Sequence, residues 1–186
     1  MSAPGTIGLI GLSPPPVIET VYPTTDDVTG SWEDEGGGTS DLWDHVNSES
    51  DADHVELRSA SHIVTSGSRS LRFITDSPSD DPIGTQTVEL RVRCRWVDVF
   101  GAANPDAGDP NVTLSLLEGT TVRATGSAQA ITTSFAEYSL FLTEAQVNAF
   151  TSWSDLRAQM VFEASGIDID EEVDIEVSRV RVVFDE

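Results

Sequence analysis

The chain has 186 residues, enough for one domain with a hydrophobic core. Its 10 basic residues are all arginines and stand against 32 acidic ones, so the formal net charge is -22. This balance disfavours direct binding to nucleic acid, which needs clustered basic side chains. The one cysteine excludes an internal disulfide and a multi-cysteine metal site, and no apolar run reaches the ~20 residues of a membrane span, so no membrane insertion is expected.

The excess of carboxylates predicts a halophilic protein, made by a salt-loving organism or by one of its viruses. A net charge of this size destabilises a compact chain in dilute buffer through self-repulsion. In strong salt the screening length falls to a few ångström, so the repulsion weakens. A GC-rich genome would account for arginine in place of lysine, but it leaves the excess of acids unexplained.

Residues 1–23 are predicted to form an extended docking arm, and residues 24–186 one β-sandwich domain. The arm has a short apolar, glycine-rich stretch followed by three prolines, and polyproline is extended and semi-rigid. No basic residue precedes the apolar stretch, so it does not fit a signal peptide, and we expect the protein to be made and assembled inside the cell. The residues expected to dock on a partner are Ile7, Leu9, Ile10, Leu12, Pro14, Pro15 and Pro16.

Residues 24–54 are expected to form a long acidic surface segment. Trp32, Leu42, Trp43 and Val46 interrupt it, and we expect these apolar residues to hold the segment against the body of the protein. Trp32 and Trp43 are also the candidates for surface recognition, because exposed aromatic rings can form a platform for sugars.

From residue 55 onward the pattern is typical of β-strands. The clearest strand covers residues 86–97, where apolar side chains alternate with charged ones, so that one face is dry and the other is charged. Trp96 falls on the dry face, as does Cys94, which is expected to be a buried inert thiol. Further strands are predicted near residues 17–22, 55–58, 69–75, 112–116, 122–124, 138–142, 156–162 and 173–184.

Arg91, Arg93 and Arg95 form a row on the charged face of strand 86–97. Such a row requires carboxylates opposite it. They could come from Asp174 and Glu176 on a neighbouring strand, or from an acidic patch on another subunit.

Two local signals refine the last third of the chain. The phase of the apolar residues changes near Ser178, which indicates a β-bulge in the last strand. Thr143 and Gln146 have the spacing of a capping box, so a short helix is predicted to begin there and to end near Ser152. Trp153 comes directly after this helix, and its side chain is expected to fill the end of the core, as a tryptophan plug. The predicted fold class is all-β: an antiparallel, jelly-roll-like β-sandwich with one short crossover helix and an extended N-terminal arm.

No catalytic set is recognisable in the sequence. There is no Gly-x-Ser-x-Gly elbow and no glycine-rich phosphate loop. Paired acids are too abundant in this chain to indicate a glycosidase. The histidines lie in polar loops or at strand edges, without the spacing of a metal-binding pair, and are expected to have no catalytic role: His45, His54 and His62.

Two acidic loops offer oxygen ligands for Ca²⁺. The first covers residues 104–111 and contains Asp106 and Asp109, and the second covers residues 168–172. Neither fits the 12-residue EF-hand pattern, and a solvated turn is the better interpretation of both. We therefore expect a protein that is not an enzyme and that has no cofactor.

A turn at residues 116–119, a strand start at 135–138, the capped helix at 142–146 and the tryptophan plug at 150–157 together resemble a β-sandwich pattern in structural proteins of tailed phages and related archaeal viruses. The resemblance covers residues 26–184 and brings no catalytic residues. It implies a virion component assembled in the host cytoplasm.

The hypothesis that follows is a capsid decoration or vertex (turret) protein, anchored through its arm to the major capsid protein or other virion subunits and acting as a homo-oligomer. One alternative is a tail or fibre component that contacts the host surface. Another is a carbohydrate-binding β-sandwich module.

Overall fold

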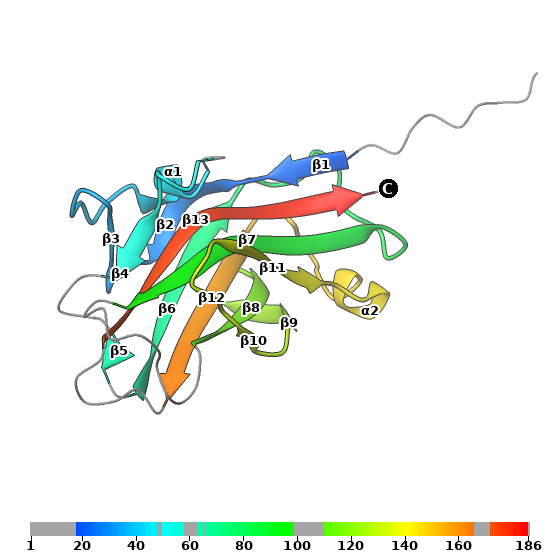
Figure 1. Cartoon of the computed structure of the whole chain (residues 1–186). Coiled ribbons are helices and arrows are strands. Elements are labelled where there is room, and N and C mark those ends of the chain that lie inside the picture. The colour runs from blue at the N-terminus through cyan, green and yellow to red at the C-terminus, as the bar shows by residue number, and fades with distance from the viewer. Residues whose placement is uncertain are drawn as a thin grey trace, which may run out of the picture.

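The computed structural model describes residues 18–47, 50–57, 63–64, 66–98, 110–165 and 172–185. Within these ranges the chain forms two antiparallel β-sheets packed face to face, which confirms the predicted all-β sandwich (Figure 1). The chain passes repeatedly from one sheet to the other, as in a jelly roll.

Sheet A carries the surface that matters most below. It consists of β11 (Ala136–Phe141), β7 (Thr87–Asp98), β13 (Glu172–Asp185), β4 (Val55–Leu57) and β3 (Trp32–Asp34) in that order, and β1 (Ile18–Val21) and β5 (Ile63–Val64) also pair with β13. Sheet B consists of β10 (Gln129–Ala130), β8 (Asn111–Glu118), β12 (Leu156–Ser165), β6 (Ser66–Thr75) and β2 (Pro23–Val28), and β9 (Thr121–Thr125) pairs with β8.

The sandwich begins earlier than the predicted boundary at residue 24. In β1, Val21 pairs with Val182 of the last strand, so residues 18–21 belong to sheet A. The next strand, β2, starts at Pro23 and lies in sheet B. The part of the predicted arm before residue 18 lies outside the described residues.

One hydrophobic core fills the space between the sheets. Side chains alternate along each strand, so every second residue of β7 points inward. The inward residues of β7 are fully or almost fully buried, as the sequence pattern predicted: Val88, Leu90, Val92, Cys94 and Trp96.

The predicted bulge lies in β13. Val177 and Arg179 are opposite consecutive residues of β7, so Ser178 is an extra residue in the ladder. The extra residue keeps Val180 on the core side and therefore turns Arg179 and Arg181 to the outer face of sheet A.

The predicted crossover helix is present as α2 (Glu144–Val147), which connects β11 of sheet A to β12 of sheet B. Its capping box is complete: the Gln146 N–H donates to Thr143 Oγ1 at 3.3 Å, and the Thr143 N–H donates to Gln146 Oε1 at 2.8 Å. The helix ends well before Ser152. Trp153 is buried and stacks on Phe150 with a ring-centroid distance of 4.0 Å, which confirms the tryptophan plug.

Residues 24–54 are not the long loop that the sequence predicted. The segment contains part of β2, all of β3 and a second short helix, α1 (Leu42–His45). The Asp26 carboxylate accepts the backbone N–H groups of Leu42 and Trp43 at 3.1 and 2.8 Å and so holds the start of α1. Leu42 and Val46 are fully buried, which confirms that they fix the segment to the body. Neither α1 nor α2 has the length or apolar character to span a membrane, and no other helix occurs in the described ranges.

Candidate functional site

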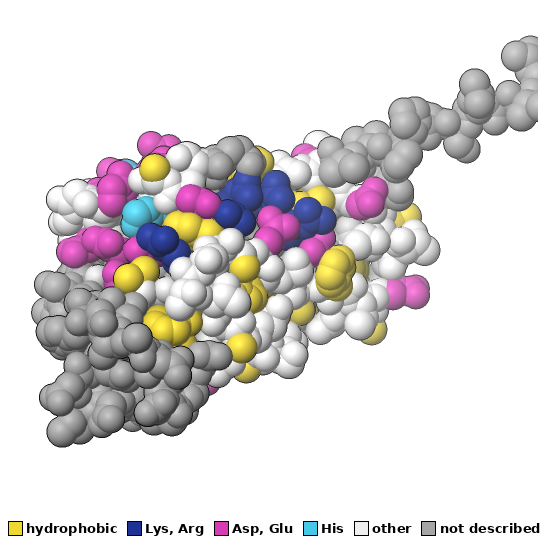
Figure 2. Space-filling model, viewed as in Figure 1, with side chains coloured by type: hydrophobic (Ala, Val, Ile, Leu, Met, Phe, Trp, Pro, Cys, Tyr) yellow, Lys and Arg dark blue, Asp and Glu magenta, His cyan; other side chains and the backbone are white. Residues whose placement is uncertain are grey.

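The outer face of sheet A carries a compact group of arginines. The register places Arg91 of β7 directly opposite Arg181 of β13, and Arg93 directly opposite Arg179. We call these four residues the arginine block. Figure 2 shows dark blue side chains gathered in the middle of this face, with magenta carboxylates between them. Like charges directly opposite each other on neighbouring strands are destabilising unless carboxylates lie among them.

One carboxylate at the centre of the block is shared by three guanidinium groups. Glu137 of β11 lies 3.0 Å from Arg181 Nη2, 3.7 Å from Arg91 Nη1 and 3.9 Å from Arg179 Nη2. Burial and the neighbouring charge of Arg181 lower the pKa of Arg179. The lowered pKa indicates that the charged form of Arg179 is disfavoured in the folded protein.

Two closer ion pairs hold the β7 side of the block. Arg91 Nη2 lies 2.6 Å from Glu89 Oε2, and the hydrogen bond between these side chains raises the pKa of Arg91. Arg93 binds Asp51 through two hydrogen bonds of 2.6 Å each, which lowers the pKa of Asp51. The Ser178 hydroxyl at the bulge also donates to Asp51 Oδ1, at 3.0 Å. These contacts hold the guanidinium planes in fixed orientations.

The predicted arginine row is present, with partners that differ in part from those expected. Arg95 Nε donates to Glu176 Oε2 at 2.7 Å, as expected. Asp174 instead accepts the backbone N–H of Leu57 through Oδ1 at 3.1 Å. The Arg95 guanidinium also lies 4.6 Å from the centre of the Phe135 ring, a cation–π contact.

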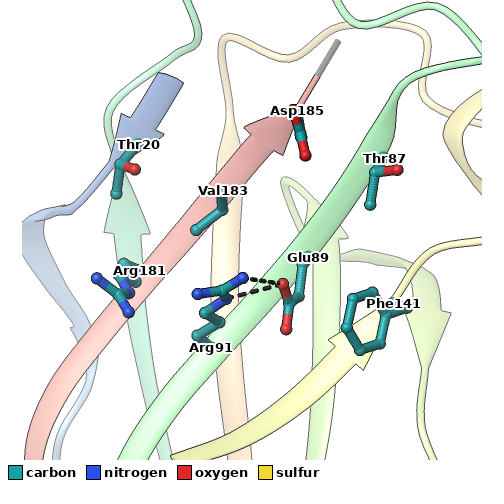
Figure 3. Close-up of a pocket in the computed structure, with 8 residues that line it drawn as sticks. All are labelled: Thr20, Thr87, Glu89, Arg91, Phe141, Arg181, Val183 and Asp185. Carbon is teal, nitrogen blue, oxygen red and sulfur yellow. Dashed lines mark hydrogen bonds and ion pairs between the residues drawn. The ribbon is translucent and has the colours of Figure 1, made fainter. Parts of the chain in front are cut away.

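A pocket of about 350 Å³ opens at one end of the arginine block. Arg91 and Arg181 belong to both the block and the pocket lining, and the remaining lining comes from β1, β7, β11 and β13 (Figure 3). The pocket therefore extends the charged face toward the end of sheet A where β1 begins.

The proposed surface role of Trp32 is wrong. Its side chain is 0% exposed, because β3 turns it toward the core. The ring packs at 5.3 Å from the Phe162 ring, and its Nε1 donates to the Ser70 carbonyl at 2.9 Å. Trp43 is half-buried and packs against the same core, so these two residues do not form an exposed aromatic platform.

Two histidines of the described residues lie among carboxylates. His45 Nδ1 lies 2.7 Å from Asp53 Oδ1 and 3.4 Å from Glu35 Oε2, and its Nε2 lies 3.6 Å from Asp34 Oδ2. Burial alone would lower the pKa of His45, but the hydrogen bond to Asp53 and the nearby carboxylates outweigh it, so that the pKa is raised. This cluster ties the end of α1 to the turns on both sides of it.

The second cluster joins His54 to Glu56 and Glu176, with N–O distances of 3.7 and 3.6 Å. Two sets of three ligand atoms lie close enough together to share one metal ion: Glu35, His45 and Asp53 in the first cluster, and His54, Glu56 and Glu176 in the second. Arg95, however, already neutralises Glu176 in the second cluster, so a metal ion is not needed there.

Several predicted site residues lie outside the described residues. They are the arm residues Ile7, Leu9, Ile10, Leu12, Pro14, Pro15 and Pro16, the calcium candidates Asp106 and Asp109, the loop before Glu172, and His62.

Sequence reasoning missed the β13 half of the arginine block. Arg179 and Arg181 are visible in the sequence next to the predicted bulge. The signal that could have identified them is the combination of that bulge with antiparallel pairing to β7, because together they place both arginines opposite the predicted row.

No protein-family model and no curated protein matches the chain. The solved structures to which the chain is similar include a Stig cyclase, Fisc, from Fischerella sp. TAU in complex with an indole compound (TM-score 0.43, 14% identity). That match covers 70% of this chain and 62% of the cyclase chain. A cyclase from the same organism in complex with 4-(1H-indol-3-yl)butan-2-one has a TM-score of 0.44 and 12% identity over 89% of this chain and 73% of its own.

An arabinose-bound α-L-arabinofuranosidase, MgGH51, has a TM-score of 0.43 and 11% identity, over 88% of this chain and 25% of its own. At this level of similarity the three structures carry no argument about function.

Proposed function

We propose that the protein is a non-enzymatic structural subunit of a tailed-virus particle, a capsid decoration or vertex protein, and that the arginine block binds an acidic surface of a neighbouring subunit. The neighbour is the major capsid protein or another copy of this chain. The observation that carries the proposal is the pair of directly opposed arginines, Arg91 with Arg181 and Arg93 with Arg179, in a chain of net charge -22. Glu137, Glu89 and Asp51 already offset part of the repulsion among these arginines, and a partner carboxylate would add to their effect.

The chemistry of the block suits a protein partner. Arginine binds carboxylates through two parallel hydrogen bonds, which gives orientation as well as attraction. The four guanidinium groups stand on two central strands of a sheet, so little conformational entropy would be lost on docking. Most of the remaining charge on the protein is negative, and it would repel a second acidic subunit that approached another face.

A role without catalysis fits the same residues. The carboxylates on this face are engaged with arginines, which suits binding better than proton transfer. Cys94 is fully buried, and burial raises the pKa of its thiol, so it is not a nucleophile. The N-terminal arm remains part of the proposal as a second anchor.

Incorporation into particles tests the docking role. The variant is Arg181→Glu, and the matched control is Arg123→Glu on β9 of sheet B, where Arg123 pairs with Glu118 at 2.7 Å. We expect Arg181→Glu to fold but to be lost from purified particles, measured as the ratio of this protein to coat protein, because its new charge repels the acidic partner. Arg123→Glu should be incorporated normally.

Wild-type incorporation of a folded Arg181→Glu would contradict the docking role of the block. Deleting residues 1–16 in parallel tests the arm. If that deletion also leaves incorporation unchanged, the proposal of a docked virion subunit fails as a whole.

A further inference from the structure

The pocket beside the arginine block has the size and position of a ligand site. Its volume of about 350 Å³ lies at the lower end of the range for small-molecule pockets. In Figure 3, Val183 lies at the centre, and the polar side chains surround it on strands β1, β7 and β13. Because these strands are hydrogen-bonded to one another, the backbone that carries the lining is fixed.

The charges of the lining balance. Arg91 and Arg181 supply hydrogen-bond donors, with Arg181 also bound to Glu137 at 3.0 Å, and Asp185 and the 4% exposed Glu89 supply acceptors. The Glu89 carboxylate holds Arg91 through one oxygen, Oε2, at 2.7 Å, and a carboxylate can accept about four hydrogen bonds in all. On a protein whose net charge of -22 repels anions, a site with two cations and two anions has no net charge of its own with which to attract a charged ligand. It favours a neutral one with many hydroxyl groups, each of which can donate and accept.

An exposed aromatic ring completes the pocket. Phe141 at the end of β11 is 61% exposed, although it is a large apolar side chain. It stands beside Glu89 on the outer face of the sheet (Figure 3). The apolar face of a sugar ring packs on such an exposed aromatic surface while its hydroxyl groups reach the polar side chains around it.

We propose that this pocket binds a neutral saccharide of roughly one or two rings. The sugar ring lies on Phe141, its hydroxyl groups bind Arg181 on one side and Glu89 and Asp185 on the other, and the Thr20 and Thr87 hydroxyls lie at the rim. Saccharide binding shares Arg91 and Arg181 with docking to an acidic subunit, whereas Phe141 and the threonines belong to the pocket alone.

Binding is tested by NMR and calorimetry on the full chain with maltose, cellobiose and lactose, and with glucuronic acid as the charged probe. We expect at least one neutral disaccharide to bind and to shift the amide signals of residues 87–91 and 181–185. Phe141→Ala should weaken that binding by roughly 3–10-fold, the value of one aromatic contact. The matched control is Val122→Ala on β9, another exposed apolar side chain (53%), which should leave binding unchanged.

Each other outcome overturns the saccharide proposal. These outcomes are no binding by any of the three disaccharides, binding of glucuronic acid alone, signal shifts away from the pocket, and equal effects of Phe141→Ala and Val122→Ala. Incorporation of Phe141→Ala into particles separates the two proposals, because docking through the arginine block does not need Phe141.

Discussion

Arg179 shows how a single residue can act against the stability of the fold that holds it. Its side chain is 13% exposed and lies opposite Arg93, and burial, together with the charge of Arg181, lowers its pKa. Its contact with Glu137, at 3.9 Å, is long. Burial and a like charge both act against the charged form of Arg179, as is typical of functional surfaces where stability is exchanged for binding.

Replacing Arg179 with methionine should therefore stabilise the protein. We expect Arg179→Met to raise the free energy of unfolding by about 0.5 kcal/mol, because it removes repulsion between opposed guanidinium groups and keeps an apolar chain over the sheet. The measurement is chemical denaturation at the lowest salt concentration at which the wild-type protein is folded.

The control is Arg157→Met. Arg157 lies 2.8 Å from Asp27 and 3.0 Å from Asp155, and its hydrogen bond to Asp155 raises its pKa, the opposite direction from Arg179. This variant should lose about 1 kcal/mol of stability. If both variants are destabilised equally, the interpretation of Arg179 as an unfavourable residue is wrong.

At the scale of one element, the bulge in β13 determines which residues form the functional face. Ser178 is the extra residue, so the strand keeps Val177 and Val180 toward the core although they are three positions apart. In an unbroken alternation Val177, Arg179 and Arg181 would share one face, and the two arginines would point into the core.

Deleting Ser178 should be tolerated, which is unusual for a deletion in a central strand. Removal of the extra residue leaves a regular ladder in which Arg179 still points outward and Val180 still points inward. The expected cost is about 1 kcal/mol for the lost hydrogen bond to Asp51. Thermal unfolding followed by circular dichroism measures this, and a native NMR spectrum would show that the fold is kept.

A deletion in a regular strand provides the contrast. Gln159 lies in the unbulged ladder of β12, and its deletion would move Met160 and Phe162 to the outer face, so that variant should not fold. If the Ser178 deletion fails to fold as well, the bulge is required for more than the phase of the strand.

The alternation of apolar and polar residues made most of the long strands predictable, because it is a local property of the chain. The short strands β2, β3 and β10 lack a sustained alternation, and the sequence did not indicate them. The wrong prediction for Trp32 has the same cause, because the segment around it has no alternation to show which side chains are buried. Its burial follows from the pairing of β3 with β4, which is not a local property of the sequence.

The candidate site was only half predictable for a related reason. Arg91 and Arg93 were recognised as a charged row, but their opposition to Arg181 and Arg179 depends on the pairing of strands far apart in the sequence. If Ser178 took part in a regular alternation instead of forming the bulge, Arg179 and Arg181 would point into the core. Local periodicity contains no information on such pairing.

At the scale of the whole molecule, charge sets the conditions under which the protein is stable. The net charge of -22 opposes compaction everywhere on the surface, while the ion pairs around the arginine block act over a few ångström. Salt screens the long-range repulsion first, because the Debye length falls from about 10 Å at 0.1 M to about 3 Å at 1 M. Contacts shorter than 3 Å between half-buried groups are screened much less.

The melting temperature should therefore rise steadily between 0.1 and 3 M KCl. If screening removes about 2 kcal/mol of repulsion, the rise is roughly 4–8 °C for a chain of this length. Calorimetry in KCl measures it, and sucrose at matched osmolality is the control, because sucrose favours the compact state by exclusion without screening charge. A melting temperature that stays flat in KCl, or that rises equally in sucrose, would show that the acidic surface is not what limits stability. A rise specific to KCl would mean that the carboxylates limit stability in dilute buffer, as expected for a protein that works in brine.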